Sequence, residues 1–512
     1  MRRPNLQREV QVDKQRRPHT VRVEARWFEL ETRSGHIRGS QMNTVLGSGE
    51  GVARDVCSRG DEPYAAGARR APQTVGQTGL DLQFLSELTA KAAAVEGKIS
   101  VAQLVDRLKL GIPVLDEITS FMIREHLLEI THRGASDFDV HYQLTEEGRI
   151  RAIGYLGRCS YVGPAPVTLG TYAKAIARQS VNLLHISQDF ARTAMAGLTI
   201  SDTLVDELGG AMNSGRPILL YGPAGGGKTH LAESLARLLP GTIDVPYALL
   251  VDRSIVQIFD PLIHVPVDDP DEGSLLAALP DRRWQRCRRP VVLAGGELTL
   301  EMLELRYDAS TGFYQAPGHM KANNGLYIVD DLGRQRVAPQ DLLNRWIVPL
   351  GRGTETLTLQ NGARFSLPFD VRLAFSSNLT PDQIGDEAFL RRLGCKMYVG
   401  PQSEADYRVL YERFCKELDV ESDAAAFEYL IEKLHVPARR PMLACYPRDL
   451  LCLVVAHARY REERAIATPD TLYRAWNSYF ANHAEAGAAP EVPDQTDKLD
   501  RPVDVIKMLA NA

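Results

Sequence analysis

The sequence predicts an α/β fold with a mostly parallel sheet, preceded by a small domain of helices with one strand and followed by an all-helical domain. Three observations lead to this. Short apolar strands alternate with helices over residues 196–400, which is typical of an α/β domain with a parallel sheet. Residues 401–484 show helical periodicity only. Residues 79–165 contain three helical segments, a strand and a turn.

Length and composition exclude several classes of protein. The chain has 512 residues, enough for three or four folded units, and 44% of them are hydrophobic. A net charge of −5 gives no overall attraction to nucleic acid or to an anionic membrane. Seven cysteines without a C-x-x-C pair argue against a disulfide framework. No apolar stretch reaches the roughly 18 residues that span a bilayer, and no secretory signal is visible, so we expect a cytoplasmic protein without a membrane partner.

The two ends of the chain are polar. Residues 1–78 are rich in Arg and Gly without a sustained apolar period, and we predict that they are disordered or weakly ordered. Met42 is a plausible alternative start within this segment. Residues 485–512 form a polar tail that contains proline.

The region 79–165 is predicted to fold as a small domain. A helix begins at Leu80, a second covers 100–110, a third covers 113–130, and a strand follows at 138–144. Three helices, a strand and a turn resemble a winged-helix domain, a variant of the helix-turn-helix. The run 98–104 looks like the second helix of that family and the run 142–149 like its wing. A helical linker is expected at 166–195.

The charges of the third helix bear on what this domain binds. A helix that reads DNA needs Lys or Arg facing the phosphates, and acids in that place repel them. The acids of the candidate recognition helix are Asp116, Glu117, Glu125 and Glu129, and its only strong base is Arg124. A protein partner is therefore favoured over DNA, although the arginines near the N-terminus leave weak affinity for nucleic acid open.

The sharpest signal is a glycine-rich loop between an apolar strand and a helix. The strand is 218–221, and the helix places Leu231, Leu235 and Leu238 on one face. Strand, loop and helix follow in the order that a P-loop requires. The loop and the residue after it are Gly222, Pro223, Ala224, Gly225, Gly226, Gly227, Lys228, Thr229 and His230.

These residue types suit a bound nucleoside triphosphate. Glycines let the backbone curl around phosphates with its N–H groups pointing inward, where side chains would obstruct it. The helix N-terminus adds partial positive charge. Lys228 would neutralise the β- and γ-phosphates and Thr229 would ligate Mg²⁺. The sequence thus predicts that the loop binds ATP together with Mg²⁺.

A second apolar strand ends in two acids. Residues 325–331 read as a buried strand that closes with Asp330 and Asp331, about 100 residues after the loop. Apolar strands often end in Asp because turns favour it, but the order and the distance favour a Walker B motif. Asp330 would hold Mg²⁺ through water, and Asp331 would orient the attacking water.

Three later segments complete a resemblance to the AAA+ family of ATPases. The strand 371–378 resembles the sensor-1 strand, 389–393 resembles the arginine-finger segment, and 446–450 resembles sensor 2. Each piece alone is weak, but all of them stand in the family's order. The residues that the resemblance singles out are Asn378 at the γ-phosphate or attacking water, Arg391 or Arg392 as the finger, and Arg448 as the sensor-2 arginine.

The resemblance implies an ATP-hydrolysing core at 196–400, a helical lid at 401–484 and a nucleotide-promoted ring, with six subunits as the expected number. One departure concerns Walker B, where the family usually has Glu and this chain has Asp331. Aspartate is one methylene shorter, so the attacking water must lie closer or a bridging group must help.

A hairpin is predicted between the two strands. Alternating runs flank Asn361-Gly362 within 353–370, and the positions of the apolar residues require a loop longer than two residues. A hairpin here resembles the pre-sensor-1 insertion of the clade that holds Mg-chelatase subunits, MoxR-type chaperones and enhancer-binding transcription activators. The GAFTGA loop of the activators is missing.

Three functions remain open at this point. The first is a chaperone-like ATPase that remodels a macromolecular partner, most simply a protein client held by the winged-helix-like domain. The second is a DNA-linked ATPase, such as a transcription regulator or helicase loader. The third is a nucleotide-gated scaffold with slow hydrolysis. No H-E-x-x-H signature is present, so we do not expect the chain to degrade its partner.

Overall fold

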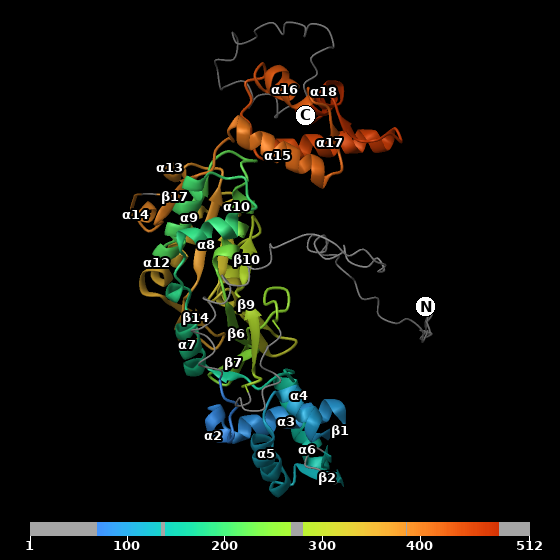
Figure 1. Cartoon of the computed structure of the whole chain (residues 1–512). Coiled ribbons are helices and arrows are strands. Elements are labelled where there is room, and N and C mark those ends of the chain that lie inside the picture. Colours follow the sequence, from blue (N-terminus) through green and yellow to red (C-terminus); the bar gives the residue numbers. More distant parts are fainter. Residues whose placement is uncertain (1–68, 135–138, 268–279, 386, 481–512) are drawn as a thin grey trace, which may run out of the picture. The chain divides into compact units, whose positions relative to one another are not determined.

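The computed structural model describes residues 69–134, 139–267, 280–385 and 387–480 (Figure 1). The predictions for residues 1–68 and 485–512 lie outside the described residues. The segment 69–78, predicted to be weakly ordered, is folded. Arg69 lies 3.7 Å from the ring centroid of Trp284, and α2, Val75–Thr78, buries Val75. Folded structure therefore begins before residue 79, because these side chains pack on later parts of the chain.

The N-terminal domain combines helices with a small sheet. Its three strands form an antiparallel sheet in the order β1-β3-β2. One hydrophobic cluster holds helices and sheet together, with Leu88, Leu104 and Ile118 fully buried. The elements are α3 (Leu82–Glu96), β1 (Lys98–Ser100), α4 (Val101–Leu108), α5 (Ile112–Arg124), β2 (Leu128–Arg133), β3 (Val140–Leu144) and α6 (Glu146–Arg158).

Three details of the prediction for this domain are wrong. Residues 98–100, predicted to belong to the second helix, form strand β1, which pairs with β3. The third helix ends at Arg124 instead of residue 130, and Glu129 lies on β2, which pairs with β3. The turn that was expected after the predicted strand 138–144 is the start of α6, because the Thr145 hydroxyl accepts a hydrogen bond from the Gly148 N–H (3.0 Å) and caps the helix. The run 142–149, predicted to be a wing, is therefore divided between β3 and α6.

The α/β domain is built on a five-stranded, fully parallel sheet in the order β10-β13-β16-β5-β17. The strand of the phosphate loop, β5, thus lies between β16 and β17, and the strand of the acid pair, β13, lies on the other side of β16. The strands are β5 (Ile218–Tyr221), β10 (Val291–Ala294), β13 (Leu326–Val329), β16 (Arg372–Ser377) and β17 (Cys395–Tyr398).

Helices cover both faces of this sheet. Ile218 and Leu220 of β5 face a cluster that includes α8 (Gln188–Met195), α9 (Asp202–Ser214) and α10 (Lys228–Ser234). Leu219 faces the opposite cluster, which contains Trp346 of α12 (Pro339–Arg352). Alternate residues of a strand point to opposite faces, so an apolar run without alternation is what a strand buried on both faces requires.

The rest of the α/β domain departs from the predicted parallel sheet. The chain also forms a second, mixed five-stranded sheet in the order β11-β12-β8-β7-β4, and a separate pair, β6 and β9. The predicted linker 166–195 supplies β4 to this sheet and α8 to the main domain. The elements are β4 (Val167–Thr168), α7 (Leu169–Arg178), η2 (Val181–Leu183), η3 (Leu235–Leu238), β6 (Thr242–Pro246), β7 (Ala248–Val251), β8 (Ser254–Gln257), β9 (Trp284–Arg288), η4 (Glu301–Leu303), β11 (Arg306–Asp308), β12 (Phe313–Gln315) and α11 (Gly318–Lys321).

The predicted hairpin is confirmed. Strands β14 (Thr354–Thr358) and β15 (Arg364–Pro368) pair antiparallel with Leu357 opposite Phe365. Residues 359–363 connect them, and Gly362 adopts a φ of 83° in the left-handed region. The loop is thus longer than two residues, as the apolar pattern requires. Two short helices follow β16, α13 (Pro381–Ile384) and α14 (Glu387–Leu390).

A buried polar network ties the amino ends of the central strands to the chain before α8. Asp370 precedes β16 and accepts four hydrogen bonds. Its donors are the Ser180 hydroxyl (2.8 Å), the Val181 N–H (2.9 Å), the Asn182 amide (2.9 Å) and the Asn324 amide (2.5 Å). A buried carboxylate with this many donors stabilises the fold only while all of them remain paired.

We expect Asp370→Ala to lower the free energy of unfolding by about 3–5 kcal/mol, because it leaves several buried donors without an acceptor. The matched control is Asp382→Ala, an exposed acid for which we expect a change within about 0.5 kcal/mol. Guanidinium chloride unfolding of both variants measures the difference. A loss below about 1 kcal/mol for Asp370→Ala would show that the network does not hold the domain together.

The C-terminal domain is mainly helical, as predicted, but it also contains two short strands that pair parallel. Its elements are α15 (Glu404–Glu417), β18 (Glu421–Ser422), α16 (Ala426–Tyr429), η5 (Leu430–His435), α17 (Tyr446–Tyr460), β19 (Ile466–Ala467) and α18 (Pro469–Phe480).

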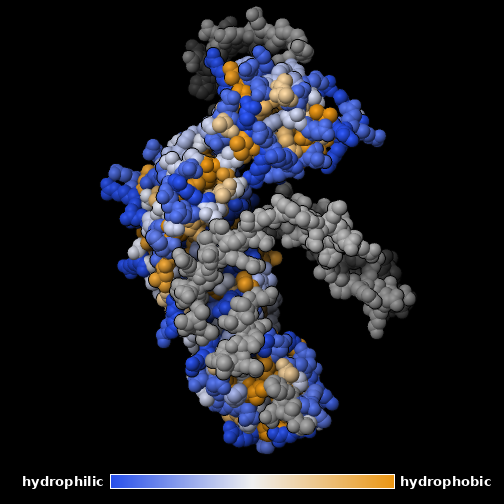
Figure 2. All heavy atoms as spheres, viewed as in Figure 1, coloured by the Kyte–Doolittle hydropathy of each residue, from blue (hydrophilic) through white to orange (hydrophobic). Residues whose placement is uncertain are grey.

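The face drawn in Figure 2 is mostly hydrophilic, with separate hydrophobic patches. Within the described part of the chain, no helix is long and apolar enough to span a membrane.

Candidate functional site

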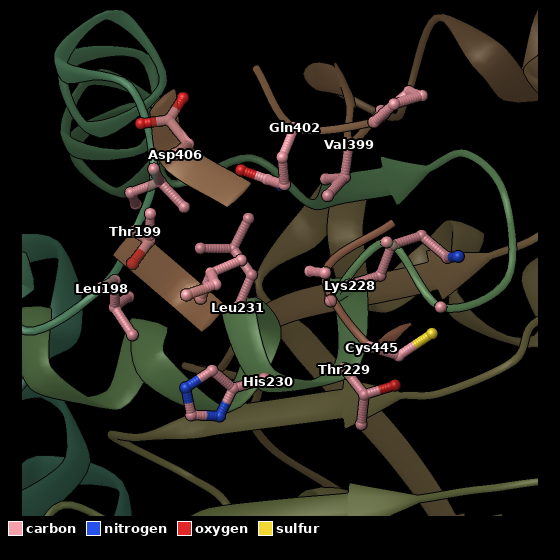
Figure 3. A pocket seen from close by; sticks show the side chains of 18 of the residues that line it. Leu198, Thr199, Lys228, Thr229, His230, Leu231, Val399, Gln402, Asp406 and Cys445 are labelled. Atoms are coloured by element: carbon pink, nitrogen blue, oxygen red, sulfur yellow. The ribbon is translucent and has the colours of Figure 1, made fainter. Parts of the chain in front are cut away.

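A cavity of about 950 Å³ lies at the carboxyl edge of the parallel sheet. Ligand sites of open α/β sheets form at this edge, because the loops after the strands meet there. In Figure 3, Leu198, Thr199 and Asp406 lie on one side of the view and Lys228 and Cys445 on the other. The predicted site residues that line the cavity are Ala224, Gly225, Gly226, Gly227, Lys228, Thr229, His230, Asp331, Asn378 and Arg448.

The phosphate loop has a backbone that only glycines allow. Gly222, Gly225 and Gly227 have φ values of 148°, 85° and 93°. A Cβ at Gly222 would lie 2.3 Å from the Val399 carbonyl oxygen, and one at Gly225 would lie 2.5 Å from the sulfur of Cys445. The loop is therefore closely fitted between β17 and the residues before α17, and its residues fit a cradle for phosphate groups.

The ammonium group of Lys228 is held at the mouth of this loop. It donates hydrogen bonds to the carbonyl oxygens of Gly222 (3.1 Å) and Pro223 (2.8 Å) and to Oδ1 of Asn378 (2.7 Å). Burial lowers the pKa of Lys228, while the nearby carboxylates of Asp331 and Asp330 act in the opposite direction. The side chain is only 5% exposed, so its charge faces the cavity from a fixed position.

Thr229 and Asp330 form the candidate metal pair. The Thr229 hydroxyl lies 3.0 Å from both carboxylate oxygens of Asp330. Ser376 of β16 also donates to Asp330 and in turn accepts a hydrogen bond from the Asp331 N–H at 3.1 Å. A hydroxyl and a carboxylate are ligands that suit Mg²⁺, which takes its other ligands from water and substrate phosphates.

Asp331 is held by two partners. Its Oδ1 accepts a hydrogen bond from the Asn378 amide at 3.0 Å, and its Oδ2 lies 3.8 Å from Nη1 of Arg334. Asn378 therefore bridges Lys228 and Asp331, since its oxygen faces one and its amide nitrogen the other. The structure thus brings the predicted loop lysine, the second acid and the sensor asparagine into one connected group.

The predicted arginines divide into two sets. Arg448, near the start of α17, lines the cavity and is exposed, as is His230. Arg391 and Arg392 do not line it. Arg391 is 78% exposed and forms an ion pair with Glu387 at 3.0 Å, and Arg392 is also exposed.

Sequence reasoning missed several residues of the site. Arg334 and Ser376 contact the acid pair, and Cys445 donates its N–H to the Gly225 carbonyl at 3.1 Å. Burial raises the pKa of the Cys445 thiol to about 11, so the sulfur stays protonated. Ser376 could have been found from its place on the strand that ends at Asn378. Arg334 and Cys445 carry no signal in the sequence beyond their distance from a motif.

A family described as a domain of unknown function (DUF8689) matches residues 403–478, within the helical lid. No curated protein sequence matches the chain.

Similar solved structures include the RuvB Holliday junction branch migration motor of Thermotoga maritima. It is 13% identical, and the alignment covers 55% of this chain and 69% of that one with a TM-score of 0.31. A mutant of the same RuvB is also 13% identical, and the alignment covers 59% of this chain and 72% of that one with a TM-score of 0.32. NtrX of Brucella abortus is 15% identical, and the alignment covers 62% of this chain and 59% of that one with a TM-score of 0.34.

The class of fold follows from the topology and the site of this chain itself. A parallel sheet carries a glycine-rich phosphate loop after β5, an acid pair after β13 and a polar residue after β16, and a helical lid adds Arg448 to the same cavity. This is a P-loop NTPase fold of the AAA+ type with a helical C-terminal lid.

Proposed function

We propose that the chain binds ATP with Mg²⁺ in this cavity and hydrolyses it to ADP and phosphate. The observation that carries the proposal is the connected group at three neighbouring strand ends: Lys228 after β5, Asp330 and Asp331 after β13, and Asn378 after β16. Phosphoryl transfer is catalysed mainly by positioning and by electrostatic stabilisation, and these side chains are the kinds that supply both.

Each residue has a role in this proposal. Lys228 neutralises the charge of the β- and γ-phosphates, and Thr229 with Asp330 holds Mg²⁺. Asp331 accepts a hydrogen bond from the attacking water, and Asn378 fixes the position of that carboxylate. Bound Mg²⁺ would supply the charge that stabilises the leaving phosphate oxygens.

The proposed working state is a nucleotide-promoted ring of identical subunits, with six as the expected number. Its support is the position of Arg391 and Arg392, which are exposed and outside the cavity of their own subunit. An arginine that stabilises the transferred phosphoryl group would then reach the ATP of a neighbour.

Hydrolysis is proposed to drive chaperone-like remodelling of a protein partner that the winged-helix-like domain holds. On α5 the exposed residues include Asp116, Glu117 and Arg124, so the surface remains acidic although Glu129 lies on β2. A surface of this charge suits a protein better than a phosphate backbone.

We expect that Asp331→Asn traps the partner in the presence of ATP, because nucleotide binding persists while hydrolysis stops. Affinity purification of this variant from cells, with ATP and Mg²⁺ present, should retain a specific set of proteins. The control is Lys228→Ala, which should retain none of them, because it does not bind ATP. Equal recovery with both variants would contradict an ATP-gated protein partner.

The alternative, a DNA-linked ATPase, predicts sequence-specific DNA binding by the winged-helix-like domain. We expect the full chain to bind duplex DNA no more tightly than about 10⁻⁶ M at physiological salt, which is ordinary nonspecific affinity. Selection from a random-sequence DNA library measures this. Enrichment of one sequence, with submicromolar affinity that Arg124→Ala abolishes, would favour the DNA-linked function instead.

A further inference from the structure

The turn after β13 places one arginine beside the second acid of the site. Asp331 and Gly333 both have positive φ values, 50° and 105°, and the Arg334 N–H closes the turn on the Asp331 carbonyl at 2.9 Å. Gln335 locks it from inside, because its amide donates to the Asp330 carbonyl (2.9 Å) and its oxygen accepts from the Gly333 N–H (2.9 Å). A Cβ at Gly333 would lie 2.6 Å from Leu379. The backbone thus directs Arg334 back over Asp331.

The two oxygens of the Asp331 carboxylate have different partners. Oδ1 faces the Asn378 amide at 3.0 Å, and Oδ2 faces the Arg334 guanidinium at 3.8 Å. Both partners line the cavity. Because one partner approaches each oxygen, together they can fix both the position and the plane of the carboxylate.

The pair contributes little to folding. The Arg334 side chain is 66% exposed and that of Asp331 is 40% exposed, and ion pairs with this exposure stabilise a protein only weakly.

We propose that Arg334 is a positioning residue that holds the short carboxylate of Asp331 toward the attacking water. The proposal rests on the proposed ATP hydrolysis. Aspartate is one methylene shorter than the glutamate that AAA+ proteins usually have, so its carboxylate must act on the attacking water over a longer distance. At that distance the carboxylate needs an external partner that keeps it in one orientation. Arg334 supplies that partner, and a longer acid at position 331 needs it less.

A double-mutant cycle tests this dependence directly. We expect Arg334→Ala to lower kcat by about tenfold or more and to leave the Kd for ATP unchanged within about twofold, because the arginine acts through Asp331. In the Asp331→Glu background, the same substitution should lower kcat by less than about threefold. Arg334→Lys should restore part of the loss. The matched control is Arg336→Ala, an exposed arginine two residues further that does not line the cavity, and it should behave as wild type.

Other outcomes overturn the proposal. An equal loss of kcat in both backgrounds, with weaker ATP binding, would mean that Arg334 contacts the nucleotide itself. No loss in the Asp331 background would mean that Arg334 has no role. ATP binding is measured for every variant by titration with a fluorescent ATP analogue, so failure of the proposed function is distinguishable. A wild-type protein that binds ATP without hydrolysing it would contradict the hydrolysis, whereas additive losses in an active enzyme would contradict only the role of Arg334.

Discussion

Lys228→Ala should abolish ATP binding while the protein remains folded. The ammonium group is the buried cation of the phosphate loop and is fixed by Gly222, Pro223 and Asn378. Removing one partner of a close charge pair costs about 2–5 kcal/mol. Since about 1.4 kcal/mol is tenfold in affinity, the expected loss is about 30-fold to several thousand-fold. The fold should persist, because Lys228 and Asn378 line the cavity, so water can reach the acceptors that the substitution frees.

Isothermal titration with ATP and Mg²⁺ measures this loss, and circular dichroism with thermal unfolding checks the fold. Lys174→Ala is the matched control, an exposed lysine of α7 that should bind ATP as wild type does. Tight ATP binding by a folded Lys228→Ala protein would rule out the phosphate loop as the nucleotide site.

The double variant Arg391→Ala/Arg392→Ala should keep ATP binding and lose hydrolysis. Negative charge builds on the γ-phosphate oxygens during transfer, and a guanidinium inserted there is worth about 10³–10⁵ in rate in related P-loop enzymes. Both arginines are exposed and neither lines the cavity of its own subunit, so the loss should reflect a missing contact between subunits. Phosphate release at saturating ATP measures it, and activity of the wild type should rise with protein concentration as rings close.

Mixing subunits separates an arginine finger from ordinary surface charges. Subunits of the double variant have an intact phosphate loop, and subunits with Lys228→Ala have intact arginines. Rings that contain both should regain part of the activity, because an intact loop then meets an intact finger next to it. Arg459→Ala/Arg461→Ala, two exposed arginines of the lid, is the control and should leave turnover unchanged. Unchanged turnover in the Arg391/Arg392 variant, or no recovery in mixed rings, would count against a finger here.

The parallel sheet could be predicted from the sequence because its strands are buried on both faces. The predicted strand 218–221 coincides with β5, and β13 and β16 lie within the predicted strands 325–331 and 371–378. The mixed sheet could not be predicted, because its strands are only two to four residues long, and because β4 pairs with β7 and β8 with β12 across large sequence distances. Strand β2 was missed for a similar reason, since Leu128–Arg133 continues the apolar period of α5 and only its pairing with β3 makes it a strand.

Some residues of the candidate site could likewise be predicted from the sequence, and others could not. Lys228, Thr229, Asp330, Asp331 and Asn378 could be predicted because each follows a buried strand, and strand ends meet at one edge of a parallel sheet. The position of Arg334 depends on a turn with two left-handed residues, and that of Cys445 depends on how the lid meets the loop. Neither arrangement is encoded in a local pattern, so both needed the three-dimensional structure.

Phosphate release from ATP by the wild type, Lys228→Ala and Asp331→Asn, measured together with ATP binding, tests the central claim most directly. We expect the wild type to release phosphate in a reaction that requires Mg²⁺. We also expect that Asp331→Asn binds ATP without releasing phosphate, and that Lys228→Ala neither binds nor hydrolyses it. Phosphate release by either variant at the wild-type rate would contradict the claim that this cavity is the site of ATP hydrolysis.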